Sequence, residues 1–387
     1  MPVEEATLET KGSAALTGAR RAAVVSLHFS PAHASHMIAL ARLLGELGFT
    51  VTFILDEKYL PFAGFEAAGE AVNARTLADP PRAGQFDLAV FCNSAFGNRC
   101  LAHQLRAGGA SVLYIFHEPE SIANLRQEGW RQIVRFPFST LCSIAMLRVS
   151  SAVIVPSACA RGLYEKHFLR YNPNVHVMPL LFEDEIGPAR LQQMRGGKRF
   201  FGYVGTACKS HGFDAFVALA RYAISSGSSI PFVIATRTDL TRLLRADNEL
   251  SRYAREGRIE IHHGRVMSNG EIDEHSLQCF CVWNVYRRST QSGVLPRALM
   301  AGTPVLASRT GSFPEYVREG VTGEFVDPVD SPAAILPVAE KMLAGISRYI
   351  DPCRESFLET FHYQANGNRL AAILQSACPG VLDMRVR

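Results

Sequence analysis

The chain reads Ser289-Thr-Gln-Ser-Gly-Val-Leu-Pro-Arg-Ala-Leu-Met-Ala-Gly-Thr-Pro-Val-Leu-Ala-Ser308 in its C-terminal third. A loop rich in Ser, Thr and Gly precedes a short apolar segment, which is the pattern of a helix that begins after a polar loop. Gly302 stands where the C-terminal cap of that helix is expected. Thr303 and Pro304 then lead into the apolar run Val305 to Ala307, which predicts a buried strand. The stretch therefore predicts a helix–strand unit of an α/β domain.

The start of this predicted helix has the features of an anion-binding site. Backbone amides around Ser292, Gly293 and Val294 are expected to point out of the helix start, where the helix dipole places partial positive charge. Further along, Ser312-x-x-Glu315 matches a capping box that begins a second helix. These features favour a site for a phosphorylated ligand, and the alternative is an ordinary structural helix–strand unit.

The order of these motifs resembles the nucleotide-sugar half of the group 1 (family 4) glycosyltransferases. That family has a glutamate in the helix before its Ala-x-Gly-x-Pro-Val motif and another glutamate eight positions earlier. Arg297 and Ser289 stand at these two positions here. The glutamate nearer the motif accepts hydrogen bonds from the donor ribose in the family, whereas an arginine only donates. The resemblance places Arg297 in the donor site, and we expect it to contact phosphate or base instead of ribose.

Composition places the chain among ordinary globular proteins. Its 387 residues are 48% hydrophobic and 20% charged, which is sufficient for two packed domains. No apolar run reaches the roughly 18 to 20 residues that cross a bilayer. Residues 1–20 lack the apolar core of a signal peptide, so we expect them to form a mobile tail.

Cysteine usage and net charge limit the compartment and the partners. The nine cysteines are an odd number without metal or disulfide spacing, which favours a reducing cytoplasm. A net charge of +4 is too small to indicate a nucleic-acid partner, and it suits an anionic donor or an anionic membrane surface. The sequence does not indicate an oligomeric state.

Short apolar runs alternate with helical periodicity along the chain, which predicts parallel sheets covered by helices on both faces. The periodicity breaks between Glu183 and Lys198, and we interpret this break as a linker between two similar domains. The predicted class is therefore α/β, and the resemblance makes it the GT-B fold, in which two Rossmann-like domains face a deep interdomain cleft. The predicted parts are a tail at 1–20, an N-terminal (acceptor) domain at 21–183, a linker at 184–198, a C-terminal (nucleotide-sugar donor) domain at 199–350 and a helix at 351–376 that crosses back to the N-terminal domain.

Two motifs of the N-terminal half are expected to line the cleft, because ligands of open α/β sheets bind at the carboxyl ends of the strands. The loop from Ser30 to His36 follows the first predicted strand, and a similar loop in the resembled family contacts the donor sugar and the acceptor. His117 and Glu118 end another apolar strand, before a proline. A histidine that titrates near neutrality suits proton transfer or hydrogen bonding to a sugar hydroxyl.

The resemblance extends to these histidines. The same His-Glu-Pro occurs in lipid-directed mannosyltransferases of the family, with its His in the active site. We therefore predict His117 as a catalytic residue, and His33, His36 and Glu118 as contacts to the sugar or the acceptor. Purely structural roles for the histidines are the alternative.

The C-terminal half opens with Phe201-Gly-Tyr-Val-Gly-Thr-Ala-Cys-Lys-Ser-His-Gly212, which reads as a strand, a glycine, a short loop and a lysine. Such a loop places a cation over a pyrophosphate, where it stabilises negative charge on the departing nucleotide. Gly205 and Lys209 are similar to the glycine and lysine of a family motif whose arginine is replaced here by Thr206. We predict Lys209 as catalytic and all three as donor-binding, and we expect Arg297 to supply the missing positive charge.

The segment 126–148 interleaves arginines with aromatic and apolar residues. This pattern suits peripheral binding to an anionic surface on the cytoplasmic face of a membrane. The alternative is a set of helices that pack into the N-terminal domain and keep their arginines in water.

The favoured function is transfer of a sugar, of the hexosyl type, from a nucleoside diphosphate sugar to a glycan, a lipid-linked saccharide or a small molecule, as in polysaccharide biosynthesis. The resemblance implies retention of the anomeric configuration, no cofactor and no metal, and the sequence has no Asp-x-Asp metal motif.

One alternative is a sugar-nucleotide epimerase, which needs acid/base carboxylates beyond Glu118. Another is a non-catalytic glycosyltransferase-like partner, which the two missing glutamates permit. The sequence does not identify the base, the sugar, the linkage or the acceptor.

Overall fold

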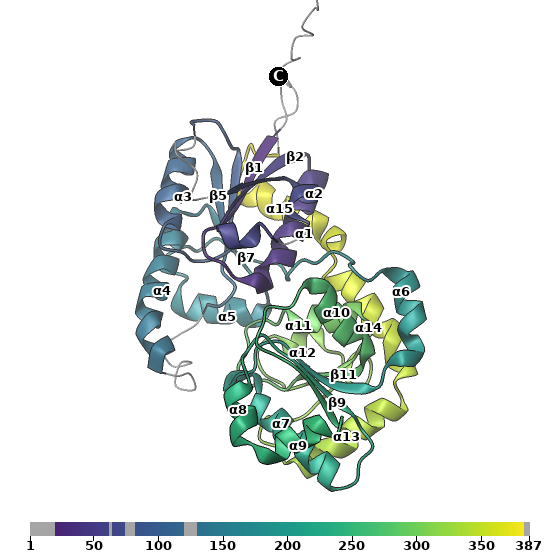
Figure 1. The fold of residues 1–387 in the computed structure, drawn as a ribbon. Coiled ribbons are helices and arrows are strands. Elements are labelled where there is room, and N and C mark those ends of the chain that lie inside the picture. The colour runs from purple at the N-terminus through teal and green to yellow at the C-terminus, as the bar shows by residue number, and fades with distance from the viewer. Residues whose placement is uncertain (1–19, 62–63, 74–81, 120–129, 383–387) are drawn as a thin grey trace, which may run out of the picture.

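The computed structural model describes residues 20–61, 64–73, 82–119 and 130–382. These residues form two α/β domains, one above the other in Figure 1, each with a parallel sheet between helices. The predicted α/β class with two Rossmann-like domains is therefore confirmed. The predicted tail lies outside the described residues except for Arg20, which begins the first strand.

The N-terminal domain is built on a parallel sheet of 7 strands in the order β3-β2-β1-β4-β5-β6-β7. Described helices join all successive strands except β3 and β4, because parallel neighbours need a crossover connection. The strands are β1 (Arg20–Ser26), β2 (Phe49–Leu55), β3 (Glu70–Asn73), β4 (Leu88–Phe91), β5 (Ser111–Ile115), β6 (Ala152–Val155) and β7 (Val175–Val177). The helices are α1 (Ala34–Glu46), α2 (Phe65–Ala68), α3 (Asn98–Ala107), α4 (Trp130–Val149) and α5 (Ala158–His167).

The C-terminal domain repeats this plan with 6 parallel strands in the order β10-β9-β8-β11-β12-β13. Its strands are β8 (Phe200–Val204), β9 (Phe232–Ala235), β10 (Ile259–His262), β11 (Cys279–Asn284), β12 (Val305–Ala307) and β13 (Gly323–Phe325). Its helices are α7 (Phe213–Ser225), α8 (Thr241–Ala246), α9 (Asn248–Arg255), α10 (Asn269–Gln278), α11 (Val294–Met300), α12 (Phe313–Tyr316) and α13 (Pro332–Ala344). In each sheet the strand order reverses beside the first strand, β1 or β8, so the loops that follow these strands border a crevice.

The strands that the sequence does not predict lie at sheet edges, although the edge strand β10 is predicted. Apolar runs in the sequence predict strands at 152–155, 232–235, 259–262 and 305–307, and these are the bounds of β6, β9, β10 and β12. Three others were not predicted: β3, β7 and β13, which lie at sheet edges and span four, three and three residues. Val175–Val177 is half-buried along its whole length, so this edge strand lacks the continuous apolar pattern of a central strand.

The connection between the domains is more regular than the sequence indicates. The predicted linker contains α6 (Gly187–Met194) and a turn of 3-10 helix, Arg195–Gly197. The predicted C-terminal helix is in fact two, α14 (Ser347–Thr360) and α15 (Gly367–Ala377). The helix breaks because Asn366 Nδ2 donates to the carbonyls of Thr360 and His362, at 3.0 and 3.2 Å, and so satisfies the end of α14.

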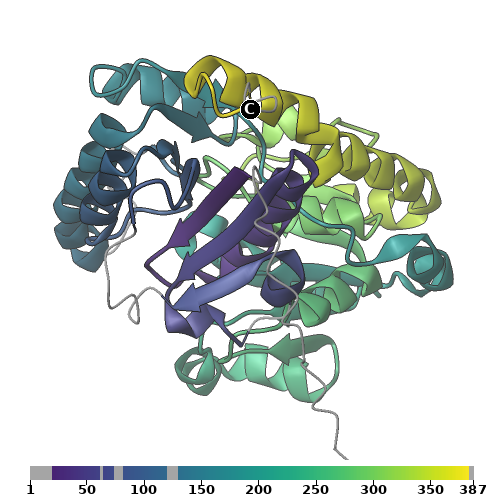
Figure 2. The same cartoon turned by 90° about the horizontal axis from the view of Figure 1, so that it is seen from above.

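The last helix returns to the N-terminal domain. Figure 2 shows the C-terminal helices running along one edge of the molecule, from the C-terminal domain to the N-terminal sheet. Leu370, Ile373 and Leu374 of α15 are buried in the same apolar core as Met37 and Leu40 of α1. The chain end therefore joins the two domains a second time.

In residues 289–315 the structure confirms the predicted helix cap at Gly302 but not the predicted capping box at Ser312. Gly302 ends α11 with a φ of +61°, as the predicted C-terminal cap requires. Ser312 makes no side-chain capping bond, so the predicted capping box does not form. Instead, the Glu315 carboxylate accepts hydrogen bonds from the amides of Ala158 and Cys159, at 2.8 and 2.7 Å. It caps the start of α5 in the other domain, because free amides and the helix dipole attract a carboxylate there.

The Gly302→Ala substitution is expected to destabilise the protein more than the matched Gly257→Ala substitution. Both glycines have left-handed backbone, with φ of +61° and +69°. A Cβ at Gly302 would lie 2.9 Å from Ile350 Cγ2, whereas a Cβ at Gly257 meets nothing within 4 Å. The left-handed conformation alone costs an alanine about 1–2 kcal/mol. Chemical denaturation should show an additional loss for Gly302→Ala, and equal losses for the two variants would contradict the packing argument.

Candidate active site

Two adjoining cavities lie between the facing domains. The first, of about 420 Å³, is lined mainly by loops at the carboxyl ends of β1, β4 and β5 and by α4, and we call it the N-terminal cavity. The second, of about 340 Å³, has walls from both domains, and we call it the interdomain cavity. Both cavities are lined by Ser30, Pro31, His33, Glu118, Arg237 and Gln291. A group bound in one cavity therefore lies next to a group bound in the other.

Most of the residues predicted from the sequence gather at these cavities. The interdomain cavity is lined by His33, His36, Glu118, Gly205, Thr206, Ser292, Gly293, Val294 and Arg297. His117 lines the N-terminal cavity. Lys209 is exposed and lines neither cavity. Its carbonyl accepts a hydrogen bond of 2.6 Å from Arg287, which also pairs with Asp214. The donor-binding role of Lys209 stays a prediction.

The loop after β8 and the start of α11 meet closely at Gly205. Gly205 has a φ of +119°, and a Cβ there would lie 3.2 Å from Val294 Cγ2. Only a glycine combines this backbone with so close an approach at low energy. At the start of α11, Ser292 Oγ accepts from the amides of Val294 and Leu295, at 3.2 and 3.3 Å. Two amides of this helix start are therefore already bonded within the chain, which the sequence did not indicate.

Three histidines form a compact group beside the cavities. The rings of His33 and His117 stack with centroids 4.2 Å apart, and the ring of His36 meets His117 edge-on at 5.6 Å. His36 Nδ1 accepts a hydrogen bond of 2.8 Å from the Leu181 amide. The Gln291 side chain approaches His117 without forming a well-aligned hydrogen bond within the described part of the chain.

Burial keeps these imidazoles neutral. Loss of solvent, together with a smaller effect of the nearby His117, lowers the pKa of His36 to about 3. Burial lowers the pKa of His117 to about 4 and holds the pKa of His33 well below its usual range. The expectation that His117 titrates near neutrality is therefore wrong. A neutral imidazole still donates from one ring nitrogen and accepts at the other, so His117 suits hydrogen bonding to a hydroxyl better than carrying a proton.

The histidine group should make stability depend on pH in acid. A histidine whose pKa is lower in the folded state binds its proton mainly in the unfolded state, so stability falls as the pH falls below about 6.5. His36→Asn keeps an acceptor for the Leu181 amide but does not titrate. Between pH 6.5 and 4, the free energy of unfolding of the natural chain should fall relative to this variant by about 1.4 kcal/mol per pH unit. Parallel curves in urea denaturation would contradict a buried neutral His36.

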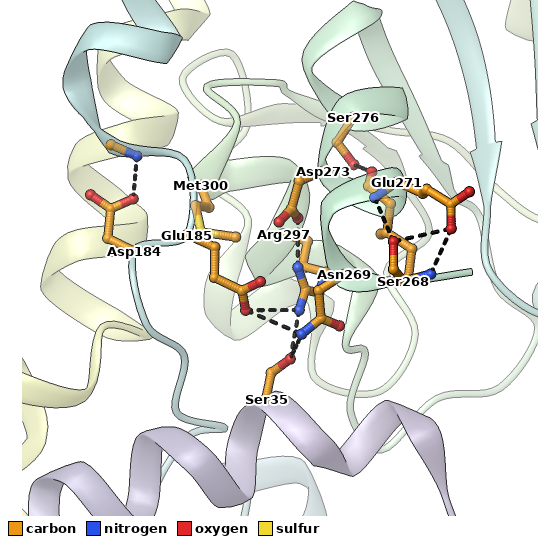
Figure 3. Close-up of polar contacts among 12 residues, drawn as sticks. Ser35, Asp184, Glu185, Ser268, Asn269, Glu271, Asp273, Ser276, Arg297 and Met300 are labelled. Atoms are coloured by element: carbon orange, nitrogen blue, oxygen red, sulfur yellow. Dashed lines mark hydrogen bonds and ion pairs between the residues drawn. The ribbon is translucent and has the colours of Figure 1, made fainter. Parts of the chain in front are cut away.

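Arg297 lies in a buried ionic cluster, which Figure 3 shows. Its guanidinium donates to Asp273 Oδ1 and Ser35 Oγ, both at 2.6 Å, and to Glu185 Oε1 at 3.1 Å. Asn269 Nδ2 donates to the same Ser35 oxygen at 2.8 Å. We call Ser35, Glu185, Asn269, Asp273 and Arg297 the arginine cluster. It joins α1 of the N-terminal domain to the interdomain segment and to α10 and α11 of the C-terminal domain.

The arginine cluster corrects the expected role of Arg297. The residue is only 5% exposed, and two carboxylates already neutralise its charge. Arg297 is therefore not a free cation, and it does not supply the positive charge that the family arginine would provide at position 206. Burial also raises the pKa of Asp273 to about 6, although Arg297 acts to lower it. A contact between Arg297 and the donor base or phosphate stays a prediction, since the side chain does line the interdomain cavity.

Restoring the glutamate of the resembled family at this position should damage the protein. Arg297→Glu would place three carboxylates together in a buried site, and breaking a buried ion pair costs about 3–5 kcal/mol. The double variant Asp273→Leu with Arg297→Met removes both charges and should lose much less stability. Denaturation measures stability, and turnover with nucleotide sugars measures function. An Arg297→Glu variant that is as stable as the natural chain, or that turns over faster, would show that the arginine cluster is misassigned.

Comparison with known proteins gives a family match for part of the C-terminal half and a fold for the whole chain. Residues 198–344 match the family model described as glycosyl transferases group 1. Among curated proteins nothing matches. Among solved structures, sucrose-phosphate synthase from Thermosynechococcus elongatus aligns with a TM-score of 0.70 at 15% identity, over 92% of this chain and 98% of that one.

Other solved structures align over similar lengths. HepE from Anabaena, in complex with UDP-glucose, has a TM-score of 0.68 at 14% identity, over 92% of this chain and 99% of that one. A glycosyltransferase from Rickettsia africae has a TM-score of 0.63 at 12% identity, over 93% and 99%. The chain thus has the GT-B fold, and its predicted resemblance to the group 1 glycosyltransferases is confirmed.

Proposed function

We propose that this protein is a glycosyltransferase that binds a nucleoside diphosphate sugar in the interdomain cavity and transfers the sugar to a hydroxyl group held in the N-terminal cavity. The observation that carries the proposal is the junction of the two cavities, which share six lining residues between the facing domains. A donor and an acceptor bound there would meet without any rearrangement of the fold.

The donor side is supported from two directions. The family match covers the domain that contributes Gly205, Thr206 and the start of α11 to the interdomain cavity. HepE, which has the same fold, is described in complexes with UDP-glucose and with UDP. A volume of about 340 Å³ lies within the range of sites for small ligands and cofactors.

The acceptor side is supported by the polar lining of the N-terminal cavity. Part of its wall is formed by side chains with hydroxyl or amide groups: Asn93, Ser94, Ser139, Thr140 and Ser143. These groups donate and accept hydrogen bonds, as the hydroxyls of a sugar do. In the proposed reaction the acceptor oxygen bonds to the anomeric carbon, the bond from that carbon to the diphosphate breaks, and the hydroxyl proton leaves with the diphosphate. Retention of configuration and independence from metal follow from the family resemblance and belong to the proposal.

A membrane-bound acceptor is part of the proposal, through the segment 126–148. Residues 126–129 lie outside the described residues, as do the side chains of 130–136. In the described part, Phe138 and Leu141 of α4 are 72% and 63% exposed. Among the described helices none is both long and apolar enough to cross a bilayer. Peripheral binding at the cytoplasmic face therefore depends on surface contacts such as these, and sedimentation with anionic vesicles tests it.

A ligand screen followed by product analysis tests the proposed function. Thermal shifts are measured with nucleoside diphosphates and their sugars, since a ligand at 100 times its dissociation constant adds about 2.7 kcal/mol to stability. Donors that bind are then incubated with hydroxyl-bearing acceptors. Formation of a glycoside supports the transferase, an isomerised nucleotide sugar indicates the epimerase, and binding without any product indicates a non-catalytic partner.

His117→Ala should lower turnover by about 10²-fold or more, the scale of a positioned acid/base or hydrogen-bonding group, and should change nucleotide affinity little. His117 lines the N-terminal cavity and not the interdomain cavity, so its loss is expected to affect acceptor and sugar positioning first. His103→Ala, at an exposed position of α3, is the matched control. A His117→Ala protein that melts early yet turns over normally when folded would decide for a purely structural histidine.

A further inference from the structure

The interdomain cavity needs a positive charge if it holds a diphosphate, and the positions expected from the sequence do not provide one. Thr206 replaces the arginine of the family motif, and Lys209 lines neither cavity. Arg297 is neutralised inside the arginine cluster. Among the described residues, the arginine and lysine side chains that line either cavity are Arg237 and Arg297 alone. Arg237 is therefore the candidate that remains.

Arg237 is exposed and lies in the loop between β9 and α8. Its side chain lines both cavities. No described carboxylate lies within ion-pair distance of its guanidinium, in contrast to Arg287, which pairs with Asp214 at 2.6 Å. Its five N–H donors are thus available to a ligand at the junction of the cavities.

The loop that carries Arg237 is fixed to the loop that carries Thr206. The Ala207 amide donates to the hydroxyls of Thr236 and Thr238, at 3.1 Å each. The Thr238 amide donates to Thr236 Oγ1, also at 3.1 Å, and Tyr203 holds the Thr206 carbonyl at 2.7 Å. The two residues that flank Arg237 in sequence are therefore bonded to the residue that follows Thr206.

We propose that Arg237 binds the diphosphate of the nucleotide-sugar donor. It would take the role of the family arginine, whose position Thr206 occupies in this chain. This inference rests on the proposed function and adds a residue to it from a different loop. A guanidinium matches the geometry of phosphate oxygens through paired hydrogen bonds. At the junction of the cavities it also lies where negative charge develops on the departing diphosphate, and a fixed cation there lowers the barrier to transfer.

Calorimetry with UDP, ADP, GDP and CDP, each compared with its own nucleoside, tests the inference. For the nucleotide that binds most tightly, Arg237→Ala should weaken the diphosphate by about 10-fold or more, the worth of a hydrogen bond to a charged group, and leave the nucleoside nearly unchanged. Arg237→Lys should recover part of the loss, because it keeps the charge without the paired geometry. Arg245→Ala, at an exposed position of α8 that lines neither cavity, is the control and should bind like the natural chain.

Three outcomes would overturn the inference. Normal diphosphate binding by Arg237→Ala, with a loss in Lys209→Ala, would assign the diphosphate to Lys209. An equal loss of diphosphate and nucleoside would show that Arg237 shapes the cavity and does not bind phosphate. A natural chain that binds none of the four diphosphates would overturn the proposed function as well, whereas the first two outcomes leave it standing.

Discussion

The arrangement of the domains depends on one buried charge, the guanidinium of Arg297. A charge taken out of water must be paired, because an unpaired buried ion costs several kcal/mol, a large part of the roughly 5–15 kcal/mol that holds a protein folded. The partners of Arg297 come from α1, from the interdomain segment and from α10. The two carboxylates that neutralise Arg297 come from the interdomain segment and α10, and the Ser35 hydroxyl of α1 adds a hydrogen bond from the N-terminal domain. Glu315 adds a second tie, since its carboxylate caps α5 across the same interface.

This constraint also sets the electrostatics of the cleft. Arg297 would be the obvious cation for a phosphate, but Asp273 and Glu185 already neutralise its charge. The buried histidines are neutral, because their pKa values lie far below physiological pH. The positive charge that a diphosphate needs is therefore left to Arg237, at the junction of the two cavities. On the acceptor side, part of the wall carries hydroxyl and amide groups, which can hydrogen-bond the hydroxyls of a sugar.

The sequence predicted the fold well and the site in part, for physical reasons. Central strands such as Ala152–Val155 are continuous apolar runs, and the cap at Gly302 follows from local backbone geometry. His33, Thr206 and Gly293 line one cavity because each follows a parallel strand, and the carboxyl ends of such strands border the crevice. Pairing across long distances in the chain has no local signal. Ser35, a partner of Arg297, and Ala158, a partner of Glu315, each lie more than 100 positions away in the sequence. Asp273, the nearest partner of Arg297, lies in another helix. These contacts were therefore not predicted. Arg237 was missed because it follows a strand whose loop matched no motif.

The central claim is that a nucleoside diphosphate binds between the domains with its diphosphate at the junction of the two cavities. The most direct test is a crystal structure of the protein with UDP, or with whichever diphosphate stabilises it most. The account predicts the diphosphate next to Gly205 and Thr206, which line the interdomain cavity, with a phosphate oxygen about 3 Å from the Arg237 guanidinium. It also predicts that the arginine cluster remains intact. A nucleotide bound outside the interdomain cavity, or a diphosphate that Arg237 does not touch, would contradict the account.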